Sequence, residues 1–104
     1  MTRASTAVAN TFSASADGAR WIAPAALTFD NAAPALAAAR SMSPPASGVV
    51  DLSGLHAVDS SAVAVLLALK RRATAQRRRI AFTGTPPALA SLASLYGVED
   101  LIDG

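Results

Sequence analysis

The chain has 104 residues, of which 52% are hydrophobic and 15% charged, and it carries a net charge of +2 at pH 7. This length is typical of one domain, and the hydrophobic content is too high for an unfolded chain. The chain has no cysteine, which excludes disulfides and thiolate metal sites, and only one histidine, so we expect no metal site and no cofactor.

Residues 1–10 show no hydrophobic periodicity, and we expect a flexible tail there, followed by a single domain at 11–104. No apolar run near the beginning has the length of a signal peptide. The longest apolar run, 62–69, is far short of the roughly 20 residues that cross a bilayer. We therefore expect a cytoplasmic protein.

Two short strands are predicted first, at 11–16 and 19–23, because Asp17-Gly18 between them is typical of a hairpin turn. We expect the second strand to resume at 26–28, after an interruption at Pro24. A helix should follow to about residue 42, capped by Asp30 or Asn31.

The second half alternates strands and helices. The apolar run 49–53 predicts a buried strand, and residues 54–59 turn the chain into a largely apolar, buried helix from Ser60 to about Ala73. A strand at 79–83 should place Ile80 and Phe82 on one face.

The last predicted helix begins at Pro86, with Thr85 as its cap, and ends at Gly97. Residues 98–102 are expected to form a short strand or an extended segment.

These elements predict an α/β (α+β) fold with parallel pairing in the second half. We expect one mixed sheet of four to five strands, with about three helices packed mainly on one face. The large residues expected in its core are Trp21, Ile22, Leu27, Phe29, Leu52, Leu66, Leu67, Ile80, Phe82, Leu89, Leu92 and Leu95.

Six of the nine basic residues lie between Lys70 and Arg79. A solvated helix end and turn would account for them, although an acidic partner, anionic lipid or nucleic acid could also meet such a cluster. Proteins that bind single strands use exposed aromatic rings, whereas Phe82 is expected in the core and Tyr96 is the only other ring nearby. We therefore expect no nucleic-acid partner.

The stretch with most chemical content is Asp59-Ser60-Ser61, where a loop after a buried strand meets a helix start. A carboxylate and two hydroxyls would lie beside unpaired N–H groups at the positive end of the helix dipole. Helix capping explains these residue types. A phosphate on Ser60 would also be stabilised there, so both interpretations stay open.

No catalytic site is found in the sequence. A nucleophile elbow would need glycines where Val58 and Ala62 stand, and the six glycines form no phosphate-binding loop. His56 precedes Ser60 by only four residues and has no evident orienting partner, so we expect a partly exposed loop residue. The protein is not expected to be an enzyme.

The run from Val50 to Leu67, with DLSGL at 51–55 and VDSSAVAVLL at 58–67, resembles the central motif of STAS domains, the superfamily of anti-anti-sigma factors. The segment LASLYGVEDLI at 92–102 resembles the end of the MlaB-like subgroup. Together the resemblance covers about residues 11–102 and implies the STAS fold.

The resemblance implies a non-enzymatic accessory subunit that binds and stabilises the ABC ATPase (MlaF-like) of an Mla-type phospholipid-transport system, which serves outer-membrane lipid asymmetry. Its partner-binding surface would be Asp59, Ser60, Ser61, Ala62 and Val63. Such a subunit would be cytoplasmic, peripheral at the inner membrane, and in contact with the membrane only through the complex. Self-association without the partner is left open.

The alternative is an anti-anti-sigma partner-switching regulator, bound by an anti-sigma kinase and controlled by phosphorylation of Ser60, which matches the regulatory hydroxyl of that family. Ala62 stands where those factors usually have glycine. Its methyl group would narrow the approach of a kinase, which argues against the switch.

Overall fold

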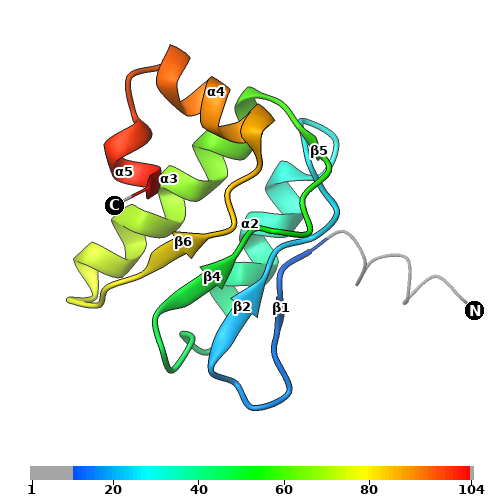
Figure 1. The fold of residues 1–104 in the computed structure, drawn as a ribbon. Coiled ribbons are helices and arrows are strands. Elements are labelled where there is room, and N and C mark those ends of the chain that lie inside the picture. The colour runs from blue at the N-terminus through cyan, green and yellow to red at the C-terminus, as the bar shows by residue number, and fades with distance from the viewer. Residues whose placement is uncertain (1–10, 104) are drawn as a thin grey trace, which may run out of the picture.

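The computed structural model describes residues 11–103 of the chain (Figure 1). In chain order its elements are β1 (Ser13–Ala14), β2 (Arg20–Ile22), β3 (Ala26–Leu27), α2 (Ala32–Ser41), β4 (Val49–Asp51), β5 (Ala57–Val58), α3 (Ser60–Ala75), β6 (Ala81–Thr83), α4 (Pro87–Leu95) and α5 (Glu99–Asp103). The predicted tail, 1–10, lies outside the described residues.

The main sheet has four strands in the order β1-β2-β4-β6. Strand β1 is antiparallel to β2, and β4 pairs in parallel with β2 on one side and with β6 on the other. The predicted hairpin turn is confirmed: Asp17 Oδ1 accepts hydrogen bonds from the Ser15 hydroxyl and the Ala19 N–H. The predicted mixed α/β architecture is therefore confirmed.

One row of side chains across the sheet packs into the hydrophobic core. Trp21, Val50 and Phe82 are register partners on β2, β4 and β6, and all three are buried. Their neighbours along the strands point to the opposite face and are more exposed. Because only one face of the sheet is apolar, α2 and α3 pack on that face, side by side (Figure 1).

Most of the predicted core is confirmed, with Leu27, Leu52, Leu66 and Leu89 fully buried. The prediction was wrong for Phe29 and Leu95, which are 84% and 74% exposed. Leu95 is the last residue of α4, and Phe29 lies in the loop between β3 and α2, so neither side chain faces the sheet.

The segment expected to continue the second strand forms a separate sheet instead. Ala23 donates to the Asp51 carbonyl, but Pro24 has no N–H to extend the pairing, and the chain leaves the main sheet. Strand β3 then pairs in parallel with β5, which lies inside the predicted turn 54–59.

The C-terminal prediction was also wrong, because residues 99–103 form the helix α5 rather than a strand. Gly97, with φ of +70°, turns the chain after α4. The fully buried Ile102 anchors α5 against α3 and β6. Helix α4 begins at Pro87, one residue later than predicted, with Pro86 rather than Thr85 at the cap position.

A close backbone approach fixes the loop before β4. Gly48 has φ of +78°, and a Cβ atom there would lie 2.7 Å from the Arg79 carbonyl oxygen. The Gly48 carbonyl accepts a 2.7 Å hydrogen bond from Ala81, the first residue of β6. Only glycine allows this conformation and this approach together.

We predict that Gly48→Ala destabilises the fold more than Gly18→Ala. Both changes force a Cβ atom into the left-handed region, at a cost of about 1–2 kcal/mol. Position 18 has no atom within 4 Å of the added carbon, so only Gly48→Ala adds a backbone clash. The difference in stability is measured from the urea unfolding midpoints of the two variants at equal m-values. An equal loss of stability in both variants would contradict the close approach.

Candidate functional site

The small sheet brings two distant loops together. Strand β3 ends at Leu27, two residues before Phe29, and β5 ends at Val58, directly before Asp59 and Ser60. Because the two strands are parallel, with Leu27 opposite Val58, their carboxyl ends meet at the same edge. Phe29 and Asp59 are thus placed side by side although 30 positions separate them in the sequence.

The Asp59 carboxylate joins the two loops. One oxygen, Oδ1, accepts a hydrogen bond of 2.8 Å from the N–H of Ser61 and so caps α3. The other, Oδ2, accepts a hydrogen bond of 3.0 Å from the N–H of Phe29. The predicted capping role is present, and the same carboxylate also holds the loop between β3 and α2.

These hydrogen bonds set the charge of Asp59. The Phe29 N–H lowers the pKa of the carboxyl below its ordinary value of 3.8, desolvation opposes this, and the Ser61 backbone and hydroxyl lower the pKa further. Asp59 is therefore ionised at neutral pH. Because the folded pKa is depressed, its stabilising effect is present above about pH 4 and is lost as the pH falls through the folded pKa.

The loop that carries Phe29 is fixed from its other side by Asn31. The Asn31 Oδ1 accepts from the Thr28 N–H at 2.9 Å, and Nδ2 donates to the Ala26 carbonyl at 2.8 Å. Asn31 occupies the predicted cap position of α2, but its side chain makes no cap hydrogen bond to that helix. Phe29 is therefore an exposed aromatic residue on a constrained loop.

The five residues predicted as a partner-binding surface differ in exposure. Ser60 is exposed and Ser61 is half-buried at the first turn of α3, next to Asp59. Ala62 is 0% exposed and Val63 is 5% exposed, and both pack into the core. The Ala62 methyl group thus faces inward and cannot narrow the approach of another protein, which corrects the expectation drawn from that position.

Phe29 was missed as a surface residue because any large apolar side chain is first assigned to the core. Its neighbours carried a signal: Thr28, Asp30 and Asn31 are turn and cap residues, and a loop just before a helix lies at the surface.

A protein-family model described as Mlab, STAS domain, matches residues 25–103, from just before β3 through α5. The chain belongs to this STAS-domain family. No curated protein matches it in sequence. The match confirms the predicted STAS fold, and the family is generally non-enzymatic.

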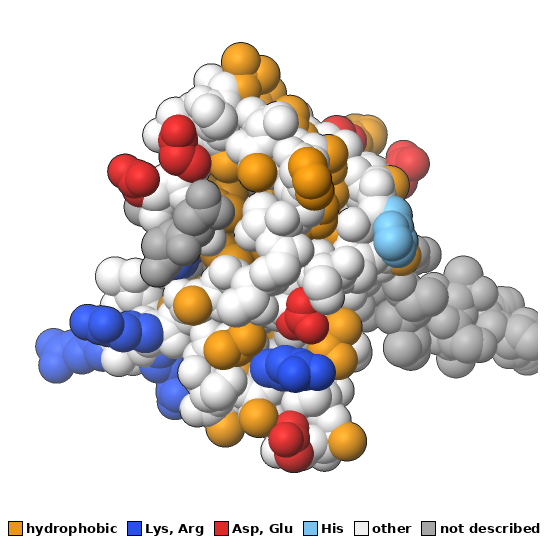
Figure 2. Space-filling view, viewed as in Figure 1, with side chains coloured by type: hydrophobic (Ala, Val, Ile, Leu, Met, Phe, Trp, Pro, Cys, Tyr) orange, Lys and Arg blue, Asp and Glu red, His pale blue; other side chains and the backbone are white. Residues whose placement is uncertain are grey.

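Two further polar features of the sequence can be placed in this STAS domain. His56 is exposed just before β5, as predicted. Lysine and arginine side chains gather at the lower left of Figure 2, where α3 ends and the turn to β6 begins. Among the residues that the structure describes, no group of acidic residues and histidine could hold a metal ion, and no helix is long and apolar enough to span a bilayer.

We predict that Asp59→Asn lowers the urea unfolding midpoint of the STAS domain at pH 7, because an amide cannot accept through both terminal atoms and the Phe29 bond is lost. As the pH falls below about 4, the wild-type carboxylate is protonated and its midpoint should converge on that of the variant.

Asp30→Asn is the matched control, since the Asp30 side chain accepts no hydrogen bond within residues 11–103. This variant should keep the wild-type midpoint at pH 7. Equal midpoints for Asp59→Asn and wild type at pH 7 would show that the carboxylate does not join the two loops.

Proposed function

We propose that this STAS domain is a non-enzymatic accessory subunit that binds and stabilises the ATPase of an Mla-type phospholipid-transport ABC system. The family match supports a role in protein binding. The specific partner and transport system are proposed here from the resemblance of residues 50–67 and 92–102 to MlaB-like proteins.

The observation that carries the proposal is the exposed Phe29 beside Ser60, held in place by Asp59 and Asn31. Exposed aromatic side chains on constrained loops are typical anchors of protein interfaces, because little conformational entropy is lost when they are buried. We name Phe29, Asp59, Ser60 and Ser61 the docking surface. Ala62 and Val63 support it from below by fixing the first turn of α3.

The proposal places the subunit on the cytoplasmic side of the inner membrane, in contact with the membrane only through the ATPase complex. The docking surface suits a protein rather than a phosphate-bearing ligand. A phosphate would bind to the N–H groups of the first turn of α3, but two of these groups already donate hydrogen bonds. Ser61 donates to the Asp59 carboxylate, and Ala62 donates to the Asp59 carbonyl.

The partner-switching alternative keeps one observation in its favour: the Ser60 hydroxyl is exposed, and the buried Ala62 does not obstruct a kinase. The adjacent Asp59 carboxylate would repel a phosphate on Ser60, which favours the ATPase proposal. Mass spectrometry of the protein from its own cell, searching for phosphoserine at Ser60, separates the two.

We predict that Ser60→Arg abolishes co-purification of an ABC ATPase with the tagged chain from its native host, because a long charged side chain would occupy the centre of the docking surface. Ser41→Arg, an exposed serine at the C-terminal end of α2, is the matched control and should retain the ATPase. Retention of the ATPase by Ser60→Arg, or enrichment of a kinase in its place, would contradict the proposal.

We also predict that Phe29→Ala weakens binding of the purified ATPase roughly 30-fold, as loss of an interface anchor commonly does. The melting temperature should stay at the wild-type value, since the ring is 84% exposed. Leu95→Ala removes a similarly exposed side chain at the far end of α4 and should bind normally (Figure 1). Titration calorimetry measures the ATPase affinity of both variants. An equal loss of affinity in the two variants would show that Phe29 is not part of the interface.

A further inference from the structure

A concave site lies at the other end of α3 from the docking surface. A cavity of ≈ 100 Å³, partly open to solvent, is lined by residues of α2, of the C-terminal end of α3 and of the segment after α2. The region is separate from the docking surface, because Arg72 lies 12 residues along α3 from Ser60, a rise of roughly 18 Å.

The cavity has an apolar wall. Trp21, Met42 and Pro45 line one side, and Ala39, Leu69 and Ile80 continue the lining. The polar edge of the indole is already satisfied, since Trp21 Nε1 donates to the Ser43 carbonyl at 2.9 Å. This wall therefore offers a ligand hydrophobic contact only. This space is smaller than the dry cavity of about 150 Å³ that holds a benzene ring, so it suits a short alkyl chain that enters from the open side.

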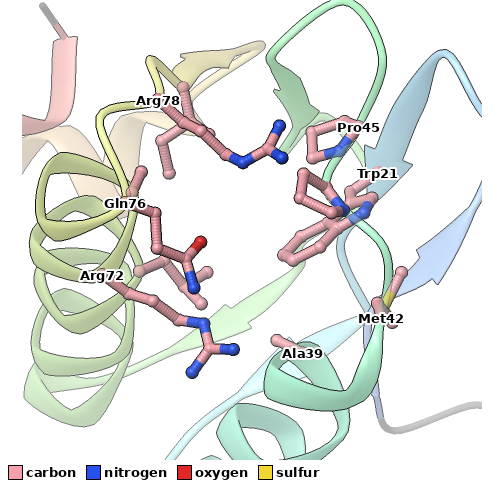
Figure 3. A pocket seen from close by; sticks show the side chains of 11 residues that line it. Trp21, Ala39, Met42, Pro45, Arg72, Gln76 and Arg78 are labelled. Atoms are coloured by element: carbon pink, nitrogen blue, oxygen red, sulfur yellow. The ribbon is translucent and has the colours of Figure 1, made fainter.

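The opposite side of the cavity is cationic. Arg72, Gln76 and Arg78 extend their polar groups toward Ala39, Trp21 and Pro45 (Figure 3). The Arg72 guanidinium donates to the Arg40 carbonyl at 3.2 Å and keeps its other donors available. The Arg78 guanidinium forms no hydrogen bond or ion pair within residues 11–103. No acidic residue lines the cavity.

The backbone before Arg78 is strained in a way that directs this side chain. Arg77 has φ of +58°, in the left-handed region that non-glycine residues rarely adopt. The turn is held by hydrogen bonds from Arg77 to the Thr74 carbonyl and from Arg78 to the Ala73 carbonyl. It reverses the chain at the end of α3 and sends Arg78 back across the cavity rather than away from it (Figure 3).

We propose that this cavity binds a small organic anion, a phosphate or carboxylate carried on a short apolar group. The apolar group would lie against Trp21 and Met42, and the anion would accept hydrogen bonds from Arg72 and Arg78. Guanidinium groups suit this role because their planar donors match both anions. The proposal is independent of the ATPase proposal and gives part of the basic cluster a function.

The test uses the full chain and three probes: n-hexyl phosphate, inorganic phosphate and 1-hexanol. Calorimetry gives the affinities, and Trp21, the only tryptophan of the chain, reports by its emission whether the cavity is filled. Hexyl phosphate should bind saturably with a change in emission, and each of the other two probes should bind at least about tenfold more weakly, because each supplies half of the contacts.

Arg78→Gln and Arg72→Gln should each weaken hexyl phosphate binding about tenfold, because this factor corresponds to the free energy of one charged hydrogen bond. Arg71→Gln is the matched control, an exposed α3 arginine that does not line the cavity, and should bind as wild type. Unchanged melting of the three variants would show that they fold. Arg78→Gln should also retain the ATPase, which separates this test from that of the docking surface.

Three results would overturn the proposal. Binding of hexyl phosphate that does not saturate, or that leaves Trp21 emission unchanged, would place the anion elsewhere on the surface. Equal affinities for inorganic phosphate and hexyl phosphate would show a nonspecific anion site without an apolar contribution. An equal loss of affinity in Arg71→Gln and Arg78→Gln would show that only the overall charge matters.

Discussion

The Asp59 carboxylate is the interaction on which the candidate site depends. It caps α3 through one oxygen and binds the Phe29 N–H through the other, so a single side chain sets both the start of the longest helix and the position of the loop beside it. The pairing of β3 with β5 makes this geometry possible, because the two strands end together. Ser60 and Phe29 then form one surface only because Asp59 lies between their two segments.

The sequence predicted the main sheet well because its signals are local. Asp17-Gly18 marks a hairpin, and the buried positions Trp21, Val50 and Phe82 sit in short apolar runs. A strand at 26–28 was predicted, but β5 and its pairing with β3 were not, because each of these strands has two residues and their stability comes from pairing with each other. Phe29 was assigned to the core because it is large and apolar, although its neighbours Thr28, Asp30 and Asn31 are typical of a surface turn. Helix α5 was missed because its one fully buried anchor, Ile102, becomes informative only when Gly97 has turned the chain.

Helix α3 separates two surfaces of different chemistry. Its first turn presents the Ser60 hydroxyl beside the ionised Asp59, and the neighbouring loop adds the Phe29 ring, a combination suited to burial against another protein. Its last turn and the chain reversal at Arg77 place the guanidinium groups of Arg72 and Arg78 at an apolar cavity. Lys70 does not take part in this second surface, since its ammonium donates to the Ile80 carbonyl and lies 5.3 Å from the centre of the Phe82 ring. The basic cluster is thus divided between a structural contact and side chains available to a ligand.

The most direct test of this account is an NMR titration of the amide protons of Phe29 and Ser61 in the wild-type chain. If one carboxylate holds both groups, the two resonances should shift together with a common midpoint below 3.8, the ordinary pKa of an aspartate side chain. A Phe29 resonance that does not follow this titration, or a common midpoint at or above 3.8, would show that Asp59 does not join the two loops.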